Sequence, residues 1–187
     1  MGMSLSRTEW TAEMLNDLPD DGCRYEVIDG ELFVTPAPSV VHQRAVSRLF
    51  MLIAPYAVRL GLDPLVAPTA VRFSHVREVQ PDVLVAPAPR DRKLLPKMKS
   101  VGTLLLAAEI LSPGSRRTDR YEKRRLYQDE NVRDYWIVDT DSRVIERWTP
   151  GATAPDMLPS TVEWQPLPQH APLVIDVVQY FRDVFDE

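Results

Sequence analysis

Three short pieces of the sequence carry side chains that could do chemistry together. Asp82 stands at the head of the apolar run 83–86, Glu109 lies inside the apolar run 104–111, and Lys123 lies in the charged segment 119–127. A carboxylate in so apolar a run is costly to bury as an ion unless a positive charge meets it. Two such carboxylates brought together repel each other, so a divalent cation is their natural partner. Hard oxygen ligands of this kind suit Mg²⁺ or Mn²⁺.

The elements around these residues determine whether they can meet. If Asp82 begins one strand and Glu109 ends its neighbour, both carboxylates fall at the same edge of a sheet. The spacing i, i+4, i+8 places Asp119, Lys123 and Tyr127 on one face of a helix. With that face turned towards the sheet, the Lys123 ammonium would approach the same edge.

Each of these residues also has a structural explanation when it is taken alone. Asp82 could be a loop or turn residue, Glu109 could form an ion pair with Arg117, and Lys123 could be a solvated helix lysine. The conjunction of the three carries more weight than any single member.

The remaining patterns predict an α/β domain with helices on a mixed sheet. The predicted helices cover residues 8–18 with Thr8 as cap, 40–60 with Ser39 as cap, and 117–131. Pro55 is expected to kink or shorten the second helix. Strands are predicted at 25–34 as a hairpin around Asp29-Gly30, at 69–73, 82–86 and 104–111, and at 134–139 and 143–148 as a final hairpin. The segment 87–100 is expected to be a long loop or short helix.

The composition is that of one ordinary globular domain. The chain has 187 residues, of which 44% are hydrophobic and 26% charged, so we expect a single domain over 1–187 with its core at about 8–148 and a C-terminal extension at 149–187. A net charge of −5 excludes a generic basic nucleic-acid coat but not a local basic patch. The single cysteine, Cys23, excludes an internal disulfide. Without an apolar leader or membrane-spanning run, we expect a cytoplasmic protein and no membrane partner.

Several short motifs occur in the order of a known family. They are Pro81-Asp82, the run 108–113 (AEILSP), the trio Asp119, Lys123 and Tyr127, the run 134–139 (DYWIVD), the opening run 24–32 (RYEVIDGEL), and Pro38-Ser39 followed by His42. Over roughly residues 10–148 the chain therefore resembles the Uma-type "putative restriction endonucleases", which belong to the PD-(D/E)XK nuclease superfamily.

The resemblance implies a restriction-endonuclease-like core, in which a central mixed β-sheet is flanked by helices. It also implies that Asp82, Glu109 and the backbone carbonyl of Ile110 ligate Mg²⁺ (or Mn²⁺). The superfamily usually places its lysine two positions after the glutamate, where this chain has Leu111. Lys123 matches the position on the next helix that Uma-type members use instead, near the scissile phosphate.

The same resemblance suggests accessory residues. Glu31 matches an acidic position at the start of the family's core and could add a metal ligand, although it could equally be a solvated hairpin residue. Glu26 carries the same ambiguity with less weight. His42 could touch a phosphate or a metal-bound water, or could serve in capping or packing. Tyr127 is a further possible accessory residue.

Two local basic runs could track the phosphates of a nucleic acid. Residues 115–125 hold six basic against two acidic side chains, and residues 90–99 hold five against one. The predicted contacts are Arg116, Arg117, Arg120, Arg124, Lys93 and Lys97. A solvated face with internal ion pairs is the alternative explanation of both runs.

These observations lead to one hypothesis with two rivals. The leading hypothesis is a Mg²⁺-dependent endonuclease that hydrolyses phosphodiester bonds by metal-assisted attack of water. DNA is the expected substrate. Nucleases that cut both strands often work as dimers, and the final hairpin and apolar tail could form such an interface. The first rival is an inactive protein of the same fold that binds nucleic acid or a protein partner. The second is a structural or regulatory protein whose carboxylates pair with local arginines.

Overall fold

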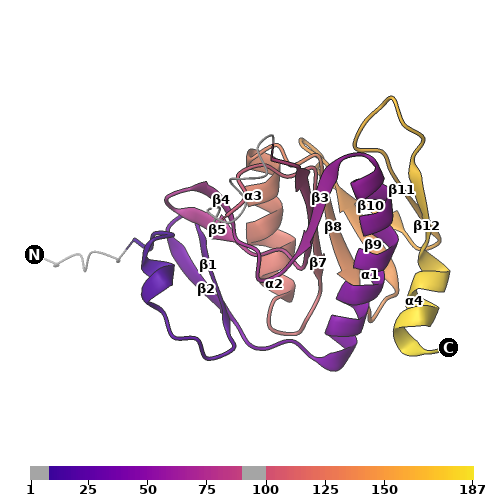
Figure 1. Cartoon of the computed structure of the whole chain (residues 1–187). Helices are drawn as coiled ribbons and strands as arrows, with labels where there is room; N and C mark the ends of the chain where they lie inside the picture. Colours follow the sequence, from indigo (N-terminus) through magenta and orange to yellow (C-terminus); the bar gives the residue numbers. More distant parts are fainter. Residues whose placement is uncertain (1–8, 90–99) are drawn as a thin grey trace, which may run out of the picture.

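A six-stranded mixed sheet forms the centre of the molecule (Figure 1). This computed structural model describes residues 9–89 and 100–187. In spatial order the sheet contains β10 (Asp156–Leu158), β9 (Val144–Trp148), β8 (Asp134–Asp139), β7 (Leu106–Ile110), β6 (Val83–Pro87) and β3 (Leu62–Val66). β7 and β8 are parallel, whereas the other neighbours are antiparallel. The predicted mixed sheet is therefore confirmed.

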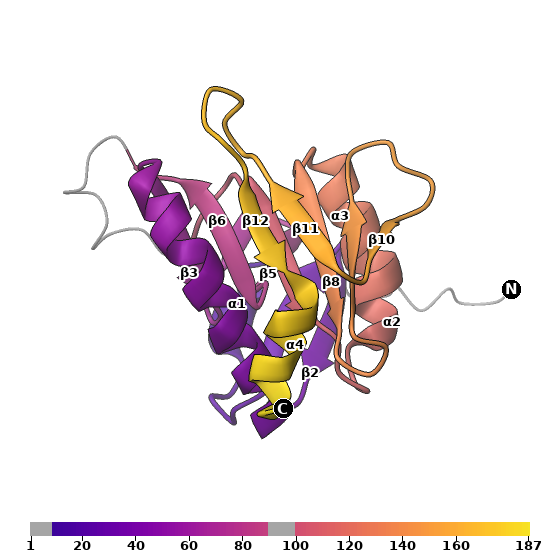
Figure 2. The same ribbon diagram turned by 90° about the vertical axis from the view of Figure 1, so that its right-hand side faces the viewer.

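Both faces of this sheet are covered. On one face lie α1 (Val40–Arg59), α4 (Val177–Phe185) and the hairpin of β11 (Thr161–Trp164) and β12 (Leu173–Asp176), as Figure 2 shows. On the other face lie α2 (Arg116–Thr118), a π-helical turn (Asp119–Lys123) and α3 (Arg124–Asp129). A second sheet covers the rest of that face, with the order β2 (Glu31–Thr35), β1 (Arg24–Ile28), β5 (Arg77–Val79) and β4 (Val71–Ser74).

Alternation along the central strands explains why the sheet has two apolar faces. Successive side chains of a strand point to opposite sides. In β7, Ala108 and Ile110 enter the core shared with α1 and α4, whereas Ala107 enters the core shared with α3 and the small sheet. The side chain of Glu109 therefore points towards α3 and the small sheet.

Two local predictions are confirmed in detail. β1 and β2 pair as an antiparallel hairpin. The turn residues Asp29 and Gly30 have φ angles of 50° and 78°, and positive φ at both central residues is what a two-residue type I′ hairpin turn requires. Ser39 caps α1, since its side chain accepts a hydrogen bond of 3.2 Å from the His42 N–H. Pro55 lies inside α1 without ending it, so of the two expected effects, a kink or a shortening, the shortening is wrong.

The N-terminal helix is shorter than predicted. Only Met14–Asp17 form a helical segment, a single 3₁₀ turn. Trp10 N–H donates to Gly30 O at 2.9 Å and Ala12 N–H to His75 O at 2.8 Å, so the preceding backbone is held against the small sheet. The expected cap, Thr8, lies outside the described residues, as does most of the segment 87–100.

The C-terminal segment completes the structure of the large sheet and its cover. β10 adds an edge strand, and α4 packs beside α1, where Tyr180 O–H donates to Ala45 O at 3.0 Å. Most apolar residues of the tail that the sequence offered for a subunit interface are buried within the chain, whereas Val174 and Val178 are exposed. The buried ones include Ile175, Val177, Tyr180, Phe181 and Val184.

Candidate active site

The register of β6 and β7 brings the two predicted carboxylates together. Val83 pairs with Ala108 in this antiparallel ladder, so Asp82 lies opposite Glu109 one step further on. Both side chains are about 2% exposed. The Ile110 N–H donates to Asp82 Oδ2 at 2.9 Å. At this end of the ladder, the Asp82 side chain thus takes the place of a backbone carbonyl group as the hydrogen-bond acceptor.

Asp82 is held by two further donors from different elements. Nη2 of Arg24, on β1, lies 2.7 Å from Asp82 Oδ1, and Nε2 of His42, in the first turn of α1, lies 3.0 Å from Oδ2. Burial alone would raise the pKa of Asp82, but the His42 hydrogen bond, the Arg24 charge and the Ile110 N–H lower it to about 2. Asp82 is therefore ionised at neutral pH.

Lys123 is the centre of a second, deeper group of charges. Its Nζ lies 2.9 Å from Glu109 Oε1, 2.9 Å from Glu26 Oε2 and 3.6 Å from Asp119 Oδ1. The ammonium is 2% exposed. Burial would lower the pKa of Lys123, but the surrounding carboxylates Glu109, Glu26 and Asp119 raise it above its usual value. Lys123 is therefore a fixed positive charge.

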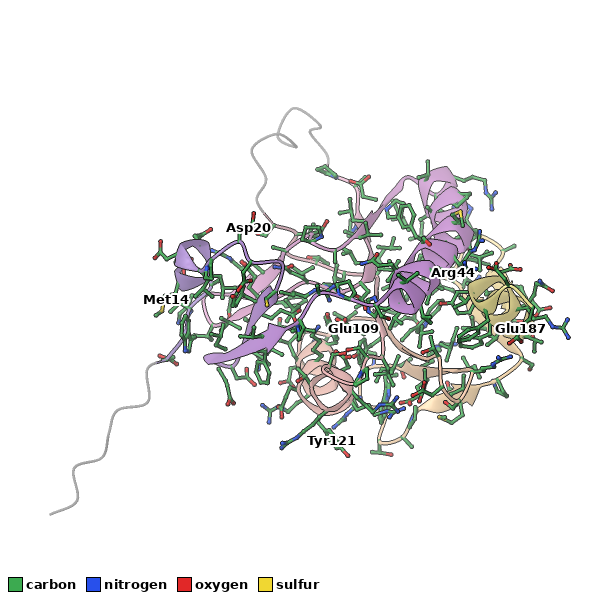
Figure 3. The ribbon with its side chains drawn as sticks, turned by 90° about the horizontal axis from the view of Figure 1, so that it is seen from below. Met14, Asp20, Arg44, Glu109, Tyr121 and Glu187 are labelled. Atoms are coloured by element: carbon green, nitrogen blue, oxygen red, sulfur yellow. The ribbon has the colours of Figure 1, made fainter. Side chains whose placement is uncertain are left out.

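The helix face predicted from the spacing of residues 119, 123 and 127 is the buried face. Asp119, Lys123 and Tyr127 are all buried, and Tyr127 O–H donates to Glu109 Oε1 at 3.2 Å. Figure 3 shows Glu109 near the middle of the molecule, whereas Tyr121 of the same π-helical turn points away from it and is 61% exposed.

The cluster holds more carboxyl groups than permanent cations. Its carboxylates are Glu26, Asp82, Glu109 and Asp119, and its permanent cations are Arg24 and Lys123. Burial raises the pKa of Glu109 well above its usual range against the pull of Lys123, and the neighbouring carboxylates raise it further. Burial likewise raises the pKa of Asp119 to about 6. A divalent cation would balance this excess of acid.

The charges open onto a cavity of about 490 Å³. Its wall includes Asp82, Glu109, Lys123, Arg24 and His42 from the cluster, together with Ser39, Gln43, Ser112 and Ser115. Within residues 9–89 and 100–187, no three histidine, cysteine, aspartate or glutamate side chains are grouped to enclose a metal ion. Asp82 and Glu109 nevertheless form a pair of carboxylates on the cavity wall, and Mg²⁺ is commonly bound through one or two carboxylates while it keeps several waters.

Most of the described basic residues predicted to bind nucleic acid are engaged within the chain. Arg120 forms ion pairs with Asp139 and Glu146, and Arg116 forms one of 2.5 Å with Asp141. The Arg124 guanidinium lies over the Trp148 ring, 4.9 Å from its centroid. Arg117 is exposed at the start of α2. Lys93 and Lys97 lie outside the described residues.

The two glutamates of the hairpin, Glu31 and Glu26, lie in different surroundings. Glu31 is exposed and does not line the cavity, whereas Glu26 is buried, with its Oε1 accepting from Gln80 N–H at 2.6 Å. Sequence reasoning gave Arg24 no role and Glu26 little weight. Their spacing places both side chains on one face of a strand, since residues two apart share a face, but it does not say what that face contacts.

Comparison with known proteins identifies the family of the chain. Residues 12–176 match the family model Uma2, described as "Putative restriction endonuclease". The chain therefore belongs to the Uma2 family. A search of curated proteins found no match.

The same fold is found in a solved structure of another protein. It is the crystal structure of a "putative nuclease belonging to DUF820" from Anabaena variabilis ATCC 29413, which is 16% identical and superposes with a TM-score of 0.72. The match covers 93% of this chain and 98% of that one. The predicted fold class and family are thus confirmed. Among the described helices, none is long and apolar enough to cross a membrane.

Proposed function

We propose that this chain is a divalent-metal-dependent endonuclease that hydrolyses phosphodiester bonds, with DNA as its substrate. The observation that carries the proposal is the pairing of Asp82 and Glu109 across β6 and β7, with the Lys123 ammonium 2.9 Å from Glu109. The family description supports the reaction class.

Asp82, Glu109 and the backbone carbonyl of Ile110 would hold Mg²⁺ or Mn²⁺. When bound, such an ion polarises the phosphate and lowers the pKa of a water molecule that can attack it. The donor set suits a hard cation because every ligand is an oxygen. The excess of buried carboxylates over fixed cations supplies the electrostatic reason for binding it.

The chain's own residues orient the ligands and stabilise charge. His42 and the Ile110 N–H hold one oxygen of Asp82, while Tyr127 and Lys123 hold one oxygen of Glu109. Both carboxylates are thereby fixed before any ligand arrives, which limits the reorganisation needed during the reaction. Lys123 adds a permanent positive charge at the cavity wall, where negative charge develops on the phosphate.

The substrate would enter the cavity beside α2. Ser112 and Ser115 line the cavity, and Arg117, two residues after Ser115, is exposed. Among the described arginines predicted to bind nucleic acid, Arg117 is therefore the one best placed to contact a neighbouring phosphate. Lys93 and Lys97 remain predicted contacts from the sequence. A homodimer likewise remains a prediction, which sedimentation of the purified protein would test.

Removal of either carboxylate should abolish cleavage. We expect Asp82→Asn and Glu109→Gln to lose Mn²⁺-dependent nicking of plasmid DNA by at least about a hundredfold, because each removes one charged metal ligand. Glu163→Gln, which changes an exposed glutamate on β11, is the matched control and should cut as the unmodified protein does. Thermal melts of all four proteins would show that each is folded.

Full activity in either carboxylate variant would refute the assignment. DNA binding without cleavage by the unmodified protein, at any Mg²⁺ or Mn²⁺ concentration, would identify the inactive nucleic-acid-binding protein instead. Absence of both DNA binding and a response to metal would favour the structural ion-pair protein.

A further inference from the structure

The four oxygens of Asp82 and Glu109 fall into two groups. One oxygen of each carboxylate is held by buried donors: Asp82 Oδ2 by His42 and the Ile110 N–H, and Glu109 Oε1 by Lys123 and Tyr127. The other two oxygens face Arg24, whose Nη2 lies 2.7 Å from Asp82 Oδ1 and whose Nη1 lies 3.9 Å from Glu109 Oε2.

A single guanidinium therefore spans the two carboxylates. Its two terminal nitrogens face one oxygen on each strand, which is the contact a bridging cation would make. The Arg24 side chain is 18% exposed, whereas Asp82 and Glu109 are each 2% exposed, and all three line the cavity. Arg24 is therefore the most exposed member of this trio.

Arg24 and a divalent cation cannot hold these oxygens together without strong repulsion. The guanidinium is always charged in proteins. A guanidinium and a metal ion that contact the same two oxygens would lie close together, and two positive charges so close repel in a partly buried site. The inner oxygens offer no substitute, because His42, Ile110, Lys123 and Tyr127 already donate to them. Metal binding through both carboxylates thus requires Arg24 to withdraw.

We propose that Arg24 is a resident counterion that competes with the divalent metal for Asp82 Oδ1 and Glu109 Oε2, and so sets the metal affinity of the site. This inference rests on the proposed metal-dependent function. Arg24 is thus a positioning residue. It keeps the two carboxylates in place in the metal-free protein, and it weakens metal binding because its contacts with Asp82 and Glu109 must break first.

The proposal predicts that loss of the arginine tightens metal binding. Arg24→Met removes the charge and both nitrogens while adding no hard ligand. Hydrogen bonds between charged groups contribute enough that we expect Mn²⁺, titrated alone into the protein by calorimetry, to bind roughly tenfold more tightly. The metal-free variant should melt at a lower temperature than the unmodified protein, and Mn²⁺ should raise its melting temperature by more.

Arg143→Met is the matched control. Arg143 also pairs with a carboxylate, that of Glu187 at 2.7 Å, but at the C-terminus, away from the cavity. Its Mn²⁺ affinity should equal that of the unmodified protein. The gain in Arg24→Met should also persist at high salt, because distant charges are screened there whereas direct competition is not.

The outcomes separate this inference from the proposed function. Metal binding by the unmodified protein with equal or weaker binding by Arg24→Met would overturn the inference and leave the function standing. Absence of binding in both proteins would overturn both. If Arg24→Met does not fold, Arg24→Lys keeps the charge but has one nitrogen and cannot span both carboxylates, so its Mn²⁺-induced rise in melting temperature should exceed that of the unmodified protein. An equal rise would overturn the inference.

Discussion

At the scale of single residues, the site depends on charges that are each buried with a partner. Asp82 and Lys123 keep their charged forms because hydrogen bonds and opposite charges outweigh burial. Asp119 is different, because its carboxylate is buried and its ion pair with Lys123, at 3.6 Å, is longer than those that Lys123 forms with Glu109 and Glu26. Burial accordingly raises the pKa of the Asp119 carboxyl group above its ordinary value.

This difference predicts a pH effect on stability. The pKa of Asp119 is about 6 in the folded chain against an ordinary value of 3.8, so between these pH values the folded state binds more protons than the unfolded state. Stability then falls as pH rises through this window. Relative to Asp119→Asn, the unmodified protein should lose roughly 2–3 kcal/mol of unfolding free energy between about pH 4 and pH 6.

Urea unfolding at a series of pH values would measure the difference between the two proteins. Asp156→Asn, at an exposed position on β10, serves as the control and should follow the unmodified protein throughout. Parallel curves for the unmodified protein and Asp119→Asn would contradict the assignment of a raised pKa to Asp119.

The sequence identified the strand and helix members of the site but not those of the hairpin. Asp82, Glu109 and Lys123 were accessible because each lies in a distinctive pattern along the chain. The role of Arg24 depends on the docking of the small sheet against the large one, which joins residues 58 positions apart. No periodicity within a single segment reports such a contact.

At the scale of elements, the hairpin of β1 and β2 positions part of the charged cluster, because β1 carries Arg24 and Glu26. Gly30 in its turn has a φ of 78°, and an added Cβ would lie 2.8 Å from the Glu9 side chain. Gly30→Ala should therefore lower the unfolding free energy by about 1–2 kcal/mol, mostly from the left-handed backbone.

Chemical denaturation would detect this loss. Gly114→Ala is a suitable control, since Gly114 has no positive φ and its added Cβ would meet Pro36 Cδ at 3.7 Å, an ordinary contact distance. Equal stability of Gly30→Ala and the unmodified protein would show that the turn tolerates a side chain.

Other elements show where sequence patterns fail for physical reasons. β3 contains Pro64, which argues against a central strand, but β3 lies at the edge of the sheet, where a missing N–H is tolerated. β5 has only three residues, too few to establish an alternating pattern. The predicted helix 117–131 is confirmed as a helical segment over 116–129, but its π-helical turn has no recognised pattern in the sequence.

At the scale of the whole molecule, the C-terminal helix is part of the core. Val177, Tyr180, Phe181 and Val184 of α4 are all buried. Burial of each such side chain contributes roughly 1.5–3 kcal/mol, and a domain's entire stability is about 5–15 kcal/mol. A chain that ends at Asp176 should therefore lack a cooperative thermal transition.

Circular dichroism during heating would check this expectation. A chain that ends at Phe185 is the control, because it loses only Asp186 and Glu187, whose exposed ion pairs with Arg44 and Arg143 contribute little. A cooperative melt of the chain ending at Asp176, at an unchanged temperature, would show that α4 is dispensable.

The distribution of the cluster along the chain has a consequence for biosynthesis. Arg24, Asp82, Glu109 and Lys123 come from four separate segments, and α1, which carries His42, packs against α4 at the far end of the chain. We therefore expect these groups to assemble stably only after the ribosome has released the chain through α4. Products that terminate before α4 would lack the helix that packs against α1, so the assembled site is expected only in chains that extend through α4.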